Sequence, residues 1–204
     1  MSIILIRHGE TALNAARVLQ PVDTPLSDRG RLQARAVARR LATVSIGAIV
    51  SSDLARAVET AREIAAESGF AIRTSATLQE RNFGDLRGRP YDGLGFDPIS
   101  LEAAPPNGES ITEFRARVRE ALLLLRDSHA SISGDLVVVT HGLFIRTLIE
   151  QCLTLPLGIA APHRIANTSL TLFSAKPPHQ VSGINDTDHL NASLSDNPNS
   201  VSGV

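Results

Sequence analysis

The sequence contains very little cysteine, tryptophan or other aromatic residue, and each shortage excludes a class of protein. Cys152 is the single cysteine of 204 residues, and tryptophan is absent. One cysteine excludes an internal disulfide framework and a cysteine-based zinc cluster, so we expect a chain of the reducing cytoplasm. Aromatic residues make up 3%, too few for the stacking platforms that bind single-stranded nucleic acid.

The sequence also lacks a charge excess and a long apolar run. The formal net charge is −1, from 20 Lys and Arg against 21 Asp and Glu, so we expect neither a nucleic-acid partner nor a membrane partner. No apolar run reaches the roughly 18 residues that span a bilayer, and the N-terminus does not resemble a signal peptide. Lys176 is the only lysine. A GC-rich genome explains that bias, so function has to be argued from particular arginines.

Apolar runs alternate with amphipathic segments, which predicts an α/β protein. Short apolar runs that end at polar residues indicate buried strands, and periodic segments that begin at caps such as Ser27 and Ser110 indicate helices. We expect a three-layer α/β/α sandwich with a mostly parallel central sheet. The expected strands are 2–6, 46–50, 71–74, 136–139 and 169–174, and the expected helices are 14–19, 28–42, 54–67, 111–128 and 143–153.

A glycine- and proline-rich stretch interrupts the alternation in the middle of the chain. We expect one domain over residues 1–176, with a loop insertion at about 84–109, because long irregular loops usually carry function. Residues 177–204 are rich in Ser, Asn, Asp and Gly. We expect this C-terminal segment to be partly disordered, with an edge segment at 184–190.

Two of the expected strands lead into a polar residue followed by His-Gly: Arg-His-Gly at residues 7–9 and Thr-His-Gly at residues 140–142. Ligands of an open parallel sheet bind beyond the carboxyl ends of its strands, so His8 and His141 are expected in one crevice. Either histidine alone would be a structural residue, but the pair favours function. Arg7 and Arg56, the latter in the first turn of a helix, add positive charge. We therefore predict a site for an anion, with phosphate favoured.

A metal site is the alternative use of two histidines. Zinc requires a third ligand and supporting groups, but the sequence has no His-x-His, no cysteine pair and no His-Glu-x-x-His. The neighbouring arginines would also repel a cation. We expect no metal and no cofactor, and we interpret the remaining histidines as surface residues: His129, His163, His179 and His189.

Five ordered motifs resemble the signature of the histidine phosphatase superfamily, which includes the cofactor-dependent phosphoglycerate mutases. They are Arg7-His8-Gly9-Glu10-Thr11 with Asn14, Ser51-Ser52-Asp53-Leu54-x-Arg56-Ala57, Leu78-x-Glu80-x-x-Phe83-Gly84, Gly108-Glu109-Ser110 and Thr140-His141-Gly142. The resemblance covers residues 2 to about 175 and implies a phosphoglycerate-mutase-like fold.

The resemblance also implies a role for each matched residue. His8 would be the nucleophile that is phosphorylated during turnover, and Glu80 would be the proton donor used in one large branch. The residues that would bind the phosphate or face the substrate are Arg7, Asn14, Gln20, Arg56, His141 and Gly142. This chemistry needs charge stabilisation and positioning rather than Mg²⁺, and arginines, a histidine and backbone N–H groups supply both.

Hydrolysis is favoured over isomerisation by the size of the insertion. A mutase has to exclude water and hold a bisphosphate, whereas this insertion is short and offers only Arg87 and Arg89 as cations. We expect a metal-independent phosphatase that hydrolyses small phosphomonoesters through a phosphohistidine on His8, with Glu80 as general acid and base. A cofactor-dependent phosphoglycerate mutase, a phosphoprotein phosphatase and a non-catalytic phosphate-binding module remain alternatives.

Two positions depart from the pattern of the superfamily. Pro21 stands where many relatives carry glycine, and proline has no backbone N–H to contact phosphate. Arg87 stands where related phosphatases often carry an acidic residue. Two interpretations of this arginine are equally favoured: it attracts a polyanionic substrate such as a sugar or glycerate phosphate, or it is a solvated loop residue. Exposed apolar residues near the last helix also allow a homodimer.

Overall fold

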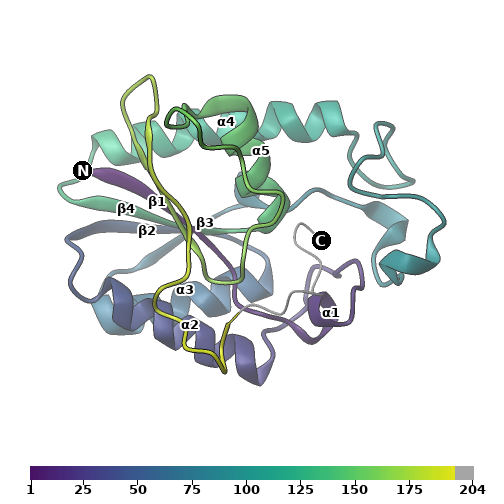
Figure 1. Cartoon of the computed structure of the whole chain (residues 1–204), viewed down its shortest axis with the longest axis horizontal. Helices are drawn as coiled ribbons and strands as arrows, with labels where there is room; N and C mark the ends of the chain where they lie inside the picture. Colours follow the sequence, from purple (N-terminus) through teal and green to yellow (C-terminus); the bar gives the residue numbers. More distant parts are fainter. Residues whose placement is uncertain (196–204) are drawn as a thin grey trace.

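A six-stranded mixed sheet forms the centre of the molecule in the computed structural model, which describes residues 1–195 (Figure 1). The strands are β1 (Ser2–Arg7), β2 (Ile46–Ser52), β3 (Ile72–Ser75), β4 (Asp135–Thr140), β5 (Leu170–Ser174) and β6 (Val181–Asp186). Their order is β3-β2-β4-β1-β5-β6. Strands β3, β2, β4 and β1 pair in parallel, and β5 pairs antiparallel with both β1 and β6. The expected α/β sandwich is thus confirmed.

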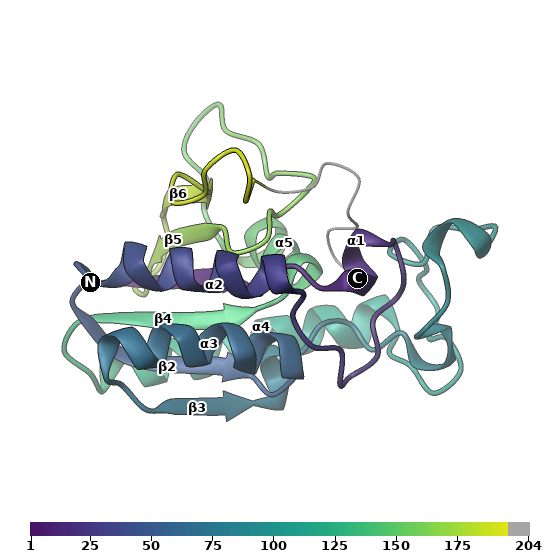
Figure 2. The same cartoon turned by 90° about the horizontal axis from the view of Figure 1, so that it is seen from below.

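Helices cover both faces of this sheet (Figures 1 and 2). Helices α4 (Ile111–Ala130) and α5 (Gly142–Cys152) lie on one face, and α2 (Asp28–Leu41) and α3 (Ala55–Ser68) lie on the other. Alternate residues of β1 therefore point into different cores: Leu5 packs in the α4–α5 core and Ile6 in the α2–α3 core. Because both cores are apolar, β1 is an uninterrupted apolar run.

The register of β1 and β4 brings the two histidine motifs level. Arg7 pairs with Thr140, the last residue of β4, and the backbone N–H of His8 donates to the Thr140 carbonyl at 2.9 Å. The chain therefore leaves both strands at the same edge of the sheet. His8 and His141 are the first residues beyond it.

The first helix is shorter and earlier than the expected helix 14–19. Helix α1 covers Ala12–Ala15, and Thr11 caps it. Asn14 completes a capping box with Thr11, so the residue expected to begin the helix forms part of its first turn. Arg17 has a φ of 58°, a left-handed conformation that ends the helix before Leu19.

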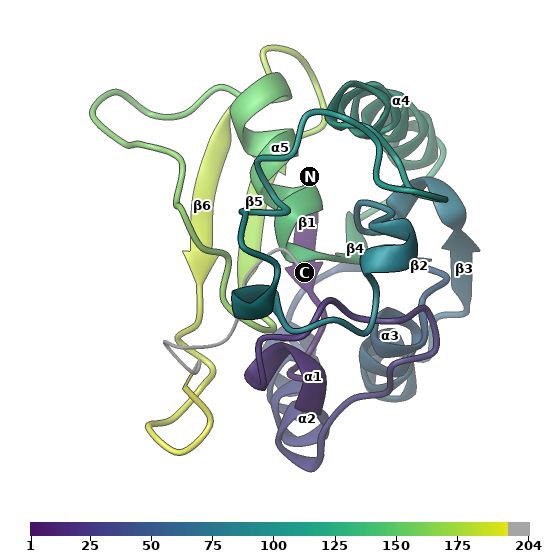
Figure 3. The same ribbon diagram turned by 90° about the vertical axis from the view of Figure 1, so that its right-hand side faces the viewer.

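The insertion crosses the carboxyl ends of the strands (Figure 3). It contains the short 3₁₀ helices η2 (Gly84–Leu86) and η3 (Tyr91–Gly93). The buried side chain of Arg81, which follows the 3₁₀ helix η1 (Ala76–Leu78), holds much of it in place. Its guanidinium donates at 2.6 to 3.5 Å to the carbonyl oxygens of Pro98, Ile99, Leu101, Ala103 and Glu109.

The sheet continues past residue 176, where we expected the domain to end. Strand β6 pairs with β5, and Val181 is buried in the α4–α5 core. The expected edge segment at 184–190 thus begins earlier and ends at Asp186. His179, expected at the surface, is buried and its Nδ1 contacts the Ser174 carbonyl at 3.1 Å. The part of the expected disorder that concerns 196–204 lies outside the described residues.

Candidate active site

The two histidines lie side by side and are almost fully buried. Their ring centroids are 5.2 Å apart, and the ring planes are tilted by 59°. Nδ1 of His8 lies 2.7 Å from the Gly9 carbonyl oxygen. Because a carbonyl can only accept, Nδ1 carries the proton, and the neutral ring keeps its lone pair on Nε2. His8 is therefore held in the tautomer that can attack through Nε2.

Burial and positive charge keep both rings neutral. Burial is the largest cause that lowers the pKa of His8 well below its usual value, followed by the charges of Arg56 and Arg7. Burial and the charge of Arg56 likewise lower the pKa of His141. Nε2 of His141 lies 2.8 Å from the Ser52 hydroxyl, which fixes its ring. At neutral pH the site therefore holds two uncharged imidazoles beside two guanidinium groups.

The two arginines of the site are anchored by backbone carbonyls. Nη1 of Arg7 donates to Ile165 at 2.6 Å, and Nη1 of Arg56 donates to Pro21 at 3.2 Å. Burial lowers the pKa of Arg56 to about 10, and the charge of Arg87 adds to this effect. Arg56 Nε and His141 Nδ1 are buried and have no hydrogen-bond partner among the described residues. The Leu54 N–H donates to the Ser52 hydroxyl, which can in turn donate to Nε2 of His141 and so leave the ring proton on Nδ1. In this tautomer both atoms are buried donors, and such donors are satisfied when an anion binds.

Glu80 binds the N-terminus of α5. One carboxylate oxygen accepts from the Leu143 N–H at 3.0 Å, and the other accepts from Phe144 at 3.2 Å and Arg81 at 3.0 Å. Burial nevertheless raises the pKa of Glu80, outweighing these bonds and the nearby charges of Arg56 and Arg7. A carboxyl group with a raised pKa can donate a proton nearer to neutral pH.

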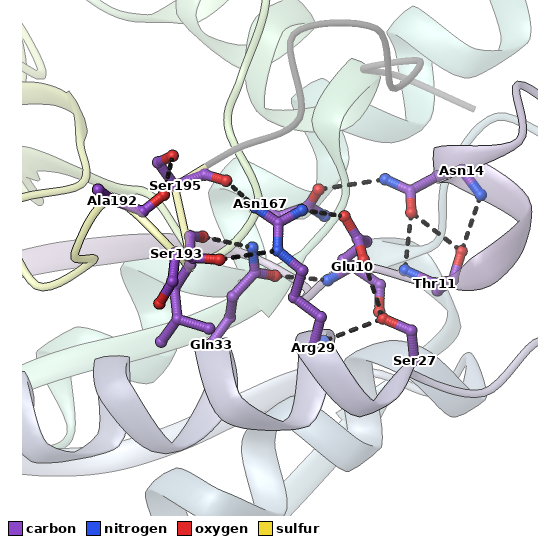
Figure 4. A network of polar contacts seen from close by, with 12 residues as sticks. Glu10, Thr11, Asn14, Ser27, Arg29, Gln33, Asn167, Ala192, Ser193 and Ser195 are labelled. Carbon is purple, nitrogen blue, oxygen red and sulfur yellow. Dashed lines mark hydrogen bonds and ion pairs between the residues drawn. The ribbon is translucent and has the colours of Figure 1, made fainter.

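Asn14 and Gln20 lie in one polar network with the backbone of His8. The Thr11 hydroxyl is 3.1 Å from Asn14 Oδ1 and 2.6 Å from Gln20 Oε1. Nδ2 of Asn14 donates to Asn167 Oδ1 at 3.1 Å (Figure 4), and Nδ2 of Asn167 donates to the His8 carbonyl at 2.9 Å. Protein contacts thus link both predicted residues to His8, and their binding of phosphate stays a prediction.

Gly142, the last predicted binding residue, begins α5 directly after His141, which is the N-cap of that helix. Three further residues contact the site and were not predicted from the sequence: Asn167, Ser52 and Arg117. Arg117 binds both carboxylate oxygens of Glu109, at 2.9 and 2.8 Å, and also donates to the Glu80 carbonyl at 3.3 Å. Two signals could have indicated two of the three: Ser52 lies within a motif that resembles the superfamily, and Asn167 lies in a polar run just before β5. Nothing in the helical spacing distinguishes Arg117.

Comparison with known proteins identifies the family. Residues 3–187 match the histidine phosphatase superfamily (branch 1). The chain belongs to the histidine phosphatase superfamily. Similar proteins include Phosphoglycerate mutase-like protein 4 of Arabidopsis thaliana, 38% identical over 185 residues that cover 84% of this chain and 78% of the relative. Probable phosphoglycerate mutase GpmB of Yersinia pestis (strain Pestoides F) is 35% identical over 181 residues, covering 84% and 83%.

Two solved structures are similar to this protein over nearly the whole chain. Bacillus stearothermophilus YhfR matches with a TM-score of 0.79 and 30% identity, covering 92% of this chain and 98% of the other. A mycobacterial glucosyl-3-phosphoglycerate phosphatase with inorganic phosphate matches with a TM-score of 0.74 and 27% identity, covering 93% and 99%. Within residues 1–195, no helix is long and apolar enough to cross a membrane, and no three His, Cys, Asp or Glu side chains are grouped to hold a metal ion.

Proposed function

We propose that this histidine phosphatase hydrolyses phosphomonoesters through a phosphohistidine on His8. One observation carries the proposal: the Nδ1–H of His8 is bound to the Gly9 carbonyl, while the buried Arg56 Nε and His141 Nδ1 beside it have no partner among the described residues. A phosphoryl group placed here would meet a lone pair on one side and hydrogen-bond donors on the other. Phosphoryl transfer needs mainly this kind of positioning and charge stabilisation.

The reaction has two balanced steps. Nε2 of His8 attacks phosphorus as the ester P–O bond breaks, and the proton of Glu80 passes to the departing alkoxide to give the free alcohol. Water then attacks the phosphohistidine, its proton passes to Glu80, and the N–P bond breaks to release phosphate. The raised pKa of Glu80 supports its role as proton donor in the first step.

A polar cavity of about 530 Å³ lies along α5, and its wall includes none of His8, Arg56 and His141. Leu143, whose N–H binds Glu80, forms part of its wall. Charged side chains of both signs, among them Glu102, Arg115 and Arg146, line it as well. Carboxylates accept from hydroxyl groups and guanidinium groups donate to hydroxyl and carboxylate oxygens. We therefore propose a substrate with a hydroxylated or anionic alcohol, such as a sugar or glycerate phosphate.

A phosphoglycerate mutase is the second candidate, because similar proteins carry that name. A mutase would interconvert 2- and 3-phosphoglycerate in the presence of a bisphosphate without net release of phosphate. A hydrolase would release phosphate from both. The two functions therefore differ in a single assay of phosphate release and isomer composition.

The first experiment is phosphate release from p-nitrophenyl phosphate in excess EDTA. We expect turnover by the wild type, a loss of at least about 10³-fold in His8→Ala, and no change in the matched control His129→Ala, whose histidine lies in the last turn of α4. Release by His8→Ala at the wild-type rate, or a requirement for metal, would contradict the proposal. Glu80→Gln should lower kcat/KM, which reports the first step, about 10²-fold for alkyl phosphates but much less for p-nitrophenyl phosphate, since nitrophenolate leaves without a proton.

A further inference from the structure

Residues 191–195 lie against α2 and are held there by two side chains of that helix. Nε2 of Gln33 donates to the Leu194 carbonyl at 2.9 Å. The Arg29 guanidinium donates through Nε to the Ser193 carbonyl at 3.3 Å, and through Nη2 to the Ser195 carbonyl (Figure 4). This stretch follows the part of the chain that matches the superfamily, residues 3–187. The contacts are thus a feature of this chain's own C-terminal segment.

The same two side chains also hold residues 8–11, the loop that carries His8 and is here named the catalytic loop. Oε1 of Gln33 accepts from the Glu10 N–H at 2.9 Å, and Nη1 of Arg29 pairs with Glu10 Oε2 at 2.7 Å. Gln33 is fully buried, so its amide bridges the C-terminal segment and the catalytic loop directly. Figure 4 shows Arg29 and Gln33 between Glu10 and residues 193–195.

Contact between backbones makes this link stiff. The Ser27 N–H donates to the Glu10 carbonyl at 2.9 Å. A Cβ atom on Gly30 would lie 1.9 Å from that carbonyl oxygen, so the start of α2 touches the catalytic loop with no space between them. The next carbonyl back, that of Gly9, orients the His8 ring. A shift of Glu10 therefore passes through a single residue to the nucleophile.

We propose that residues 191–195 position the catalytic loop, acting through Gln33 and Arg29. This inference rests on the proposed function for its effect on turnover, because the loop carries the proposed nucleophile. Gln33 and Arg29 are positioning residues, since they act on His8 through Glu10. Undocking of the C-terminal segment leaves the Gln33 amide and the Arg29 guanidinium without their outer partners, which loosens their hold on Glu10.

Asn191 offers a test that leaves the core intact, because it is exposed and stands away from the catalytic loop. Its Oδ1 accepts from the Ser193 hydroxyl at 2.7 Å and from the Leu194 N–H at 3.1 Å, which shapes the turn that Gln33 and Arg29 bind. Asn191→Ala removes this acceptor. Asn191→Asp keeps it and is the matched control.

Two measurements on full-length protein decide the proposal. Amide hydrogen exchange at Glu10, followed by NMR, is expected to accelerate about threefold to tenfold in Asn191→Ala and to match the wild type in Asn191→Asp. The kcat for p-nitrophenyl phosphate is expected to fall by a similar factor in Asn191→Ala, with KM unchanged. Unchanged exchange at Glu10, or faster exchange with unchanged kcat, overturns the proposal.

The route through Gln33 is tested by a double-mutant cycle. Gln33→Met removes both hydrogen bonds of the bridge, so adding Asn191→Ala to it is expected to change Glu10 exchange by less than about twofold. Full additivity overturns this route. If the wild type does not hydrolyse p-nitrophenyl phosphate, the proposed function fails, and Glu10 exchange alone then decides whether residues 191–195 hold the loop.

Discussion

At the scale of single residues, the site combines buried neutral imidazoles with buried cations. His8 and His141 lie against Arg56, and burial is the first cause that lowers the pKa of all three. The lone pair that would attack phosphorus is therefore not lost to a proton in mildly acidic conditions. The same burial has a cost for folding, because the unfolded chain can protonate these histidines freely.

We predict that the protein loses stability as the pH falls below about 6.5, the pKa of histidine in an unfolded chain. Because the folded-state pKa values of His8 and His141 are lower, the unfolded state binds more protons in this window. Each histidine then removes about 1.4 kcal/mol per pH unit from the free energy of unfolding. Urea unfolding between about pH 6 and pH 5 measures this slope, and a measurement at about pH 7.5 gives the stability before the loss begins.

His8→Asn is the control for that prediction. It removes one titrating group and is expected to reduce the slope by about 1.4 kcal/mol per pH unit. Glu80 changes the free energy of unfolding with the opposite dependence on pH. Burial raises the pKa of its carboxyl group, so the folded state binds this proton more tightly than the unfolded state does. Glu80 is common to both proteins, so the difference between them isolates His8. Identical slopes would contradict the neutral, buried state of this ring.

The residues of the candidate site divide into those that a sequence can indicate and those that it cannot. His8 and His141 follow apolar runs that end alike, so the rule for parallel sheets was enough to place them together. Asn167 reaches the site because β5 runs antiparallel beside β1, a pairing that no local pattern states. Arg117 binds Glu109, which stands just before the N-cap of α4, and it looks like any solvated helical arginine in the sequence.

At the scale of elements, α2 supports the catalytic loop beyond the end of the sheet. Its N-cap Ser27 accepts from the Gly30 N–H, and the Ser27 hydroxyl contacts Glu10 Oε1 at 3.1 Å. Gly30 brings the helix against the Glu10 carbonyl with no side chain between them. A glycine in the first turn of a helix is ordinarily replaceable, but here the contact between backbones requires it.

We predict that Gly30→Ala destabilises the fold although alanine is the better helix former. In an ordinary helix this change stabilises by about 0.5–1 kcal/mol. Here the new Cβ would lie 1.9 Å from a backbone oxygen, which forces α2 and the catalytic loop apart. We expect a net loss of about 2 kcal/mol in urea unfolding, and little change in Leu32→Ala, an exposed position of the same helix. A stabilised Gly30→Ala would disprove this contact.

The sequence predicted the central elements better than the peripheral ones. The strands between the two helical layers are apolar on both faces, so their apolar runs can be recognised in the sequence. Strand β6 instead has the sequence Val-Ser-Gly-Ile-Asn-Asp and is only partly buried. An edge strand of this kind has no apolar run and no clear alternation. Helix α1 was misplaced because Asn14 serves its capping box rather than following the cap.

At the scale of the whole molecule, β5 and β6 complete one side of the sheet and carry the chain to the C-terminal segment. We predict that a chain ending at residue 176 is less stable than one ending at residue 187. The shorter chain loses the burial of Val181 and part of that of Ile184, worth roughly 3 kcal/mol, which corresponds to about 6–12 °C in Tm.

Thermal unfolding of the two truncated chains checks this prediction. Both lack residues 191–195, so the comparison isolates β6 from the docking of the C-terminal segment. Equal Tm values would mean that β6 adds nothing to the core.

Leu157 and Ile159 are exposed after α5, so a homodimer through that loop stays a prediction that sedimentation can test.

The position of β1 has a consequence for how the protein is made. β1 leaves the ribosome before the other strands of this sheet, yet its two neighbours are β4 and β5, which are translated more than 120 residues later. The nascent chain therefore carries an unpaired apolar strand through most of its synthesis. Long-range pairing of this kind slows folding and favours aggregation. Residues 2–7 therefore lack their full set of strand partners until residue 174 has emerged.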